Sequence, residues 1–190
     1  SPLVRALIRF TNISKHPYFR DICRESEKVL TVDWVSGSLL LISRDNFEQI
    51  RGRDEDYWLY CEDKDLCKRA YSAGLLSAQY CGATFIESHS SSTRANPEIR
   101  ALSKSEAIIS KYLYISKHFS GSEKVLAMVS MTAIQLSKLL IWGGIYFLSR
   151  GSIKISREKY LIHLRVCKYL KRSRKNHLFI SDKSNNHRAA

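Results

Sequence analysis

The 190-residue chain has little glycine and proline, eight and three residues, which excludes collagen-like and proline-rich linker proteins. Its five cysteines form no C-x-x-C pair, so neither a zinc ribbon nor a disulfide framework is indicated, and we expect reduced cytosolic thiols. Acidic residues are also few, 18 against 31 lysines and arginines. Hydrophobic residues still make up 44% of the chain, which is enough for a packed core and argues against wholesale disorder.

The positive charge is concentrated at the C-terminal end. Residues 150–190 hold 12 Lys/Arg and 2 Asp/Glu, net +10, whereas residues 1–149 hold 19 Lys/Arg and 16 Asp/Glu, net +3. Basic tails bind nucleic acid or anionic lipid, or are simply solvated.

The composition divides the chain into five segments. Residues 1–31 are weakly patterned, and residues 32–93 carry the signals of short strands and helices. Within this second segment we expect a strand at 38–42, a helix at 44–50 after the cap Ser43, a helix at 63–73 before Gly74, and strands at 75–81 and 84–87. This order predicts an α/β domain, but the elements are too few for a complete one.

The remaining three segments are predicted to be helical. Residues 94–120 contain a helix from Pro97, capped by Asn96, to about His118, followed by a turn at Gly121-Ser122. Residues 121–150 include the most apolar run of the chain, the 25 residues 125–149, with Lys138 as the single charge. This run is long enough to cross a membrane, to lie in its plane, or to form a buried core helix. Residues 151–190 predict a basic amphipathic helix and a polar tail.

The residues with chemical potential gather in the second segment. Glu62, Asp63 and Asp65 stand at a predicted helix start, where acids are favoured by the helix dipole. The aromatic run Tyr57-Trp58-Leu59-Tyr60 comes directly before them. Aromatic surfaces beside a carboxylate suit sugar stacking and raise carboxylate basicity by partial desolvation.

Three further features admit two interpretations each. The triplets Asp54-Glu55-Asp56 and Asp63-Lys64-Asp65 could bind Mg²⁺ or Mn²⁺, but neither closes a long hydrophobic strand, and a metal site is not favoured. Ser36-Gly37 is typical of a turn or of a backbone that approaches a ligand closely. His89 lies in a serine-rich loop and is either solvated or a metal or phosphate contact.

The order of motifs resembles the C-terminal half of family-2 glycosyltransferases, closest to the bacterial rhamnosyltransferase-like branch of surface polysaccharide synthesis, such as O-antigen synthesis. The motifs, which cover about residues 32–93, are W-V-S-G-S, G-x-D-E, an aromatic run, L-Y-x-E-D-x-D-L-C, R-x-x-x-A-G and a histidine after the last strand. Arg53 departs from the family pattern, which usually has an aromatic residue there.

The resemblance implies part of a GT-A fold and an inverting transfer of a sugar from a nucleotide-sugar to a glycan or lipid-linked acceptor. It assigns Asp63 as general base with Glu62 beside it, and His89 near a divalent cation, Mg²⁺ or Mn²⁺, or the diphosphate. The remaining candidate substrate-binding residues are Trp34, Ser36, Gly37, Asp54, Glu55, Trp58 and Tyr60.

The first half of the family pattern, with its nucleotide-binding strands and D-x-D, is not found in these 190 residues. We therefore expect a fragment that is inactive alone, residing at the cytoplasmic face of the plasma membrane through its apolar and basic helices. Anionic membrane is an expected partner and nucleic acid is not. The alternatives are a non-catalytic membrane-associated protein and a basic nucleic-acid-binding protein.

Overall fold

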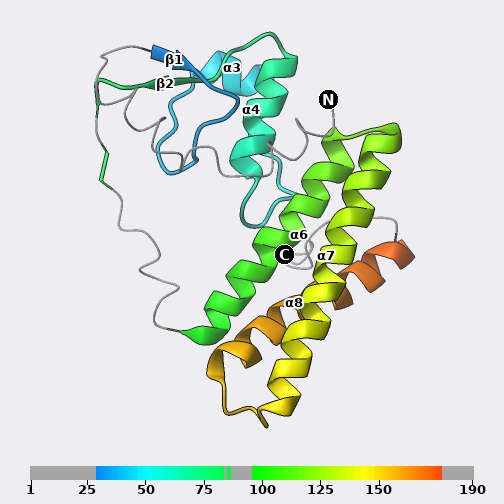
Figure 1. The fold of residues 1–190 in the computed structure, drawn as a ribbon. Coiled ribbons are helices and arrows are strands. Elements are labelled where there is room, and N and C mark those ends of the chain that lie inside the picture. Colours follow the sequence, from blue (N-terminus) through cyan, green and yellow to red (C-terminus); the bar gives the residue numbers. More distant parts are fainter. Residues whose placement is uncertain (1–28, 84, 87–95, 177–190) are drawn as a thin grey trace, which may run out of the picture. The chain divides into compact units, whose positions relative to one another are not determined.

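The computed structural model describes residues 29–83, 85–86 and 96–176, and these form two units. Unit 1 comprises the chain up to Ile50 together with Cys67–Glu87. Unit 2 comprises Arg51–Leu66 and the chain from Ser88 onward. Helix α4, Glu62–Ser72, is the cyan-green helix of Figure 1. Its residues up to Leu66 belong to unit 2 and those from Cys67 belong to unit 1.

Unit 1 combines a small antiparallel sheet with short helices. Strand β1, Val29–Thr31, pairs with β2, Ala78–Tyr80, so that Leu30 lies opposite Gln79. Helix α3, Arg44–Gln49, begins after Ser43, whose hydroxyl accepts a hydrogen bond from the amide of Asn46. Helix α4 ends before Gly74, whose φ of +81° is favourable for glycine and strained for other residues. Both helices thus lie within one residue of their predicted bounds.

The predicted strand at 38–42 is wrong, because these residues form a turn and an irregular segment. Leu39 is 58% and Leu41 95% exposed, so the apolar run is not buried. A strand needs a neighbour for its backbone hydrogen bonds, and in the described part of unit 1 β1 and β2 pair only with each other. Of the strand predicted at 75–81, only β2, Ala78–Tyr80, is a strand in the structure. Of the strand predicted at 84–87, the described residues 85–86 are irregular.

Unit 2 is built on α6, Pro97–His118, α7, Gly121–Leu148, and α8, Lys154–Asn176. The Asn96 side chain accepts from the amide of Glu98, so the predicted cap is confirmed. Gly121-Ser122, predicted as a turn, already begins α7. Helix α8 packs against both α6 and α7, and the core includes Tyr112, Ile115 and Val166. Figure 1 shows α8, in orange, crossing the other two helices.

Polar contacts join the three helices. His163 of α8 and Gln135 of α7 form a buried hydrogen bond of 2.8 Å between Nδ1 and Oε1. Glu158 of α8 pairs with Arg100 at 2.9 Å and Lys104 at 2.8 Å, both on α6. Burial opposes ionisation of Glu158, but these two cations hold the pKa of its carboxyl below the ordinary value. The pairs fix how the helices lie within unit 2.

Candidate active site

The acidic-aromatic segment, residues 51–66, folds against α6 within unit 2. The Ser110 hydroxyl donates to the Leu59 carbonyl at 2.7 Å, and the hydroxyls of Tyr60 and Ser103 share a hydrogen bond of 2.7 Å. Tyr57 packs into a small core with Cys61 and Leu113. Tyr57 is therefore a core residue and not a sugar-stacking surface, whereas Tyr60 stays 43% exposed and Trp58 is partly buried.

The chain enters α4 through two residues in the left-handed region. Tyr60 has φ +68° and Cys61 has φ +66°, a conformation that costs about 1–3 kcal/mol for each non-glycine residue. Contacts with α6 hold them there, because the Tyr60 hydroxyl is bound by Ser103 and the Cys61 side chain is buried against Leu113. Burial raises the pKa of the Cys61 thiol to about 11, so this cysteine is a neutral packing residue at pH 7.

The three acids at the start of α4 are in different environments. The Asp65 side chain is 1% exposed, and its Oδ1 lies 2.6 Å from Nε2 of His118. Glu62 and Asp63 are only partly buried, and Asp63 Oδ1 accepts from the Lys64 amide at 2.8 Å. One carboxylate oxygen of Glu62 is buried and has no hydrogen-bond partner among the described residues. Asp65 is therefore a structural acid, and Glu62 and Asp63 are the accessible pair.

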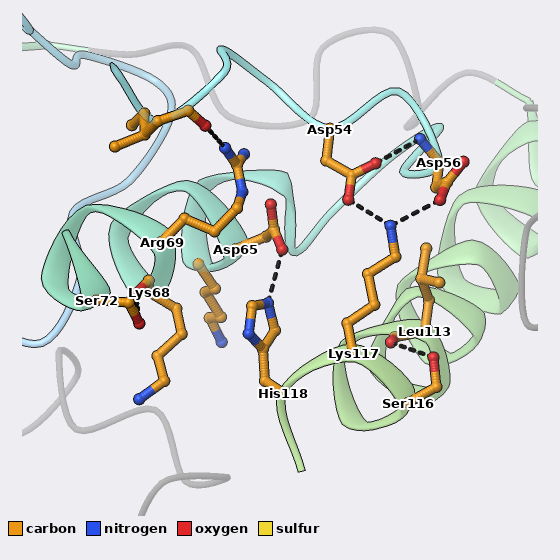
Figure 2. Close-up of polar contacts among 12 residues, drawn as sticks. Asp54, Asp56, Asp65, Lys68, Arg69, Ser72, Leu113, Ser116, Lys117 and His118 are labelled. Carbon is orange, nitrogen blue, oxygen red and sulfur yellow. Dashed lines mark hydrogen bonds and ion pairs between the residues drawn. The ribbon is translucent and has the colours of Figure 1, made fainter. Parts of the chain in front are cut away.

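His118 is a residue that the sequence interpretation missed. It lies 53 positions after Asp65, in the last turn of α6, and no local motif marks it. Its ring also lies 4.6 Å from the Tyr114 ring, centroid to centroid. Figure 2 shows the His118 ring directed at the Asp65 carboxylate. The pair ties the first turn of α4 to the end of α6.

Lys117, beside His118, holds the loop before the aromatic run. Its amine pairs with a carboxylate oxygen of Asp54 and lies 2.7 Å from one of Asp56, as Figure 2 shows. It also lies 5.4 Å from the centre of the Tyr57 ring. Burial lowers the pKa of Lys117, but the two carboxylates outweigh it and raise the pKa above its ordinary value. Asp54 is thus engaged in an ion pair, and its role in substrate binding stays a prediction.

Replacing Lys117 with methionine should loosen this loop. We expect amide hydrogen exchange of residues 54–61 to accelerate and the free energy of unfolding to fall by about 1 kcal/mol, because the bridged carboxylates lose a half-buried cation. Lys168→Met, at an exposed position of α8, is the matched control and should change neither quantity. Unchanged exchange in the Lys117 variant would show that the ion pairs do not hold the loop.

The divalent cation implied by the family resemblance stays a prediction, which rests on no site among the described residues. They contain no group of three or more histidine, cysteine or acidic side chains that could hold a metal ion. Lys117 bridges Asp54 and Asp56, and His118 binds Asp65. Each D-x-D triplet therefore has at least one carboxylate that is paired with a basic side chain. His89, the predicted metal contact, lies outside the described residues.

The other predicted site residues divide between the two units. Tyr60, Glu62 and Asp63 follow one another in unit 2, with Glu55 exposed and Trp58 partly buried in the loop before them. Trp34, Ser36 and Gly37 belong to unit 1. There the Ser36 hydroxyl bonds the Ser38 hydroxyl at 3.1 Å and accepts from the Ser38 amide at 3.4 Å. The chain turns here, as the first of the two interpretations of Ser36-Gly37 expects, and a role in ligand binding stays a prediction. No disulfide joins the described cysteines, Cys61, Cys67, Cys81 and Cys167.

Known proteins similar to this chain are rhamnosyltransferases. It is 36% identical over 90 residues to the N-acetylglucosaminyl-diphospho-decaprenol L-rhamnosyltransferase of two Mycobacterium tuberculosis strains, a match of 47% of this chain and 28% of the relative. It is 46% identical over 44 residues to rhamnosyltransferase WbbL of Escherichia coli K12, a match of 23% of this chain and 17% of the relative.

No family model matches the chain, and no solved structure matches it. The matched segment is thus a little over a quarter of the length of the mycobacterial relatives. Within that share, the resemblance to a rhamnosyltransferase-like glycosyltransferase, inferred from the motifs of residues 32–93, is confirmed.

Proposed function

We propose that this chain is the acceptor-side part of an inverting glycosyltransferase and that Asp63 is its general base. The observation that carries the proposal is the environment of the acids at the start of α4. Asp65 is buried against His118, whereas Asp63 and Glu62 remain partly exposed behind an aromatic loop. The similarity to rhamnosyltransferases supports glycosyl transfer as the reaction class. The GT-A fold remains part of this proposal.

The proposed step is a single displacement. The Asp63 carboxylate takes the proton of the acceptor hydroxyl as the hydroxyl oxygen forms a bond with the anomeric carbon of the donor sugar. The bond from that carbon to the nucleotide diphosphate breaks on the opposite face, and the diphosphate leaves with the electron pair. Because attack and departure occur on opposite faces, the anomeric configuration inverts. No part of this step is routed through a cation.

Neighbouring side chains would position the acceptor. The exposed edge of Tyr60 and the partly buried Trp58 offer aromatic surfaces to a sugar ring directly before the acids. Glu62, only partly buried beside Asp63, offers a carboxylate to a second sugar hydroxyl. Trp34, Ser36 and Gly37 of unit 1 stay candidate substrate-binding residues, on the family resemblance alone.

The substrates are proposed from the relatives. The name of the mycobacterial relatives describes rhamnosyl transfer to a sugar on a lipid diphosphate. We infer a nucleotide-activated rhamnose as donor and a lipid-linked diphosphate sugar as acceptor.

Transfer of labelled sugar to such an acceptor is the test, made with a full-length transferase that contains residues 1–190. We expect labelled lipid product from nucleotide-activated rhamnose and none from nucleotide-activated glucose. Product from the glucose donor alone would contradict the proposed substrate, and no product from a panel of donors would contradict the proposed function.

A further inference from the structure

Helix α7 presents an apolar face that no described residue of unit 2 covers. By length and composition it is the one described helix able to cross a membrane, and only 6% of its most apolar 18-residue stretch is buried. Its large exposed side chains are between 48% and 88% exposed: Val125, Leu126, Val129, Ile134, Leu136, Leu140, Ile141, Phe147 and Leu148. Contiguous apolar surface of this kind marks an interaction site, unlike single exposed apolar residues.

These side chains share one half of the helix. At about 100° per residue, they fall on an arc of about 180° along the whole of α7. The opposite half makes the contacts within unit 2, where Gln135 bonds His163 at 2.8 Å and Thr132 bonds Tyr112 at 3.3 Å. Gly143, at the border of the arc, also packs within unit 2, and a Cβ added there would lie 3.4 Å from the Tyr160 ring. The apolar arc is therefore the outer surface of unit 2.

The hydroxyl groups on this surface do not need water. Ser130 donates to the Ala127 carbonyl at 3.1 Å, and Ser137 donates to the Ile134 carbonyl at 3.0 Å. A hydroxyl bonded to its own helix can enter an apolar environment without losing a partner. The arc from Val125 to Leu148 is thus suited to a low-dielectric medium, whereas the exposed acid Glu123 precedes it in the first turn of α7.

Basic residues adjoin the apolar arc where α7 turns into α8. Arg150, Lys154 and Arg157 are exposed there, among the exposed apolar side chains of Phe147, Leu148, Ile153 and Ile155. Glu158, the first acid after this turn, is already paired with Arg100 and Lys104. The exposed charge at the turn is therefore positive, and a complementary partner is apolar and anionic.

We propose that the outer face of α7 and the turn into α8 dock onto an anionic lipid surface, with α7 lying in the membrane plane. A spanning α7 would draw α8 with it, because the buried Gln135–His163 bond joins the two helices. Helix α8 exposes Arg157, Arg165 and Lys168, and each cation costs about 2.5–3.5 kcal/mol in the hydrocarbon core.

The lysine within α7 is compatible with this arrangement. Lys138 stands at the edge of the apolar arc, next to the α7–α8 contact, and its charge is felt by His163. Burial lowers the pKa of His163, and the charges of Lys138 and Lys159 lower it further. From the edge of an in-plane helix a lysine amine reaches the headgroups while its methylenes stay on the apolar side.

Docking would bring the acidic turn close to lipid. Asp65 is tied to His118, in the last turn of α6, and α7 begins at Gly121. A lipid-linked acceptor would then meet the site without leaving its membrane. This consequence rests on the proposed function. Vesicle binding is measured without a donor sugar, so a failure of membrane docking can be distinguished from a failure of the proposed glycosyl transfer.

Vesicle binding by the 190-residue chain tests the proposal. We expect sedimentation with vesicles of phosphatidylcholine and phosphatidylglycerol, weaker binding at high salt, and little binding to phosphatidylcholine alone. Leu140→Asp should weaken binding at least about tenfold. The matched control is Leu76→Asp, since Leu76 of unit 1 is 70% exposed and Leu140 is 75% exposed. Arg150→Gln with Lys154→Gln should weaken binding to the anionic vesicles about fivefold for each charge removed.

Label depth separates an in-plane helix from a spanning one. With Cys23, Cys81 and Cys167 replaced by serine, a fluorophore on Val125→Cys, Leu136→Cys or Leu148→Cys should be quenched by lipid-attached quenchers at one shallow depth. A central label much deeper than the two outer ones would show a spanning helix and overturn the proposal. Equal loss in the two leucine variants, no vesicle binding, or tighter binding to duplex DNA than to anionic vesicles would overturn it as well.

Discussion

Asp63→Asn is expected to abolish detectable sugar transfer while leaving donor affinity unchanged. The amide keeps the size of the side chain but cannot accept the acceptor proton, and a positioned general base contributes about 10²–10⁴-fold to a rate. The effect should fall on kcat, because the proton moves only in the transition state. Initial rates in a full-length transferase containing residues 1–190 measure it, and calorimetry with the nucleotide-sugar measures donor binding.

Two matched variants show whether the loss is specific to Asp63. Asp45→Asn removes an exposed carboxylate from the first turn of α3, and its rate should equal that of the unchanged enzyme. Glu62→Gln keeps a hydrogen-bonding side chain beside the base, and it should raise KM more than it lowers kcat. If Asp63→Asn keeps more than about a tenth of the rate, Asp63 is not the base.

His118→Leu is expected to lower the free energy of unfolding of the 190-residue chain by about 3 kcal/mol. The Asp65 side chain is 1% exposed, so the substitution would remove a close hydrogen-bonding partner from a buried carboxylate. Urea unfolding followed by circular dichroism measures the change. His118→Gln retains a hydrogen-bond donor and should lose less than half as much.

A double-mutant cycle isolates the pair from other effects of the substitution. Asp65→Leu combined with His118→Leu removes the buried charge together with its partner, so the double variant should be less destabilised than the two single losses added. Additive losses would mean that the two side chains do not interact at 2.6 Å as the structure shows.

Local chemistry made the helices predictable. Ser43 and Asn96 accept backbone amides at the helix starts, and Gly74 follows the end of α4 in the left-handed region. These signals act within four residues of the bounds they set, so the sequence alone contains them. The strand predicted at 38–42 lacked such a determinant, because pairing depends on a neighbouring strand that composition does not identify.

The candidate site could be predicted only in part for the same reason. The acids and the aromatic run are contiguous, and their motif pointed to glycosyltransferases. Asp65 has a different role from Asp63 because its carboxylate is bonded to His118. Asp54 is paired with Lys117, which lies 63 positions away in the sequence. Tyr57 is buried because Leu113 lies against it. No spacing rule connects residues on α6 with a loop that precedes α4.

The anomeric configuration of the product tests the central claim most directly. The full-length transferase is incubated with a nucleotide-sugar of known configuration, and the coupling between C1 and H1 of the transferred sugar is measured by NMR. A single displacement with Asp63 as base predicts that every product molecule has the inverted configuration. Product that retains the donor configuration would require a second displacement and would contradict the account.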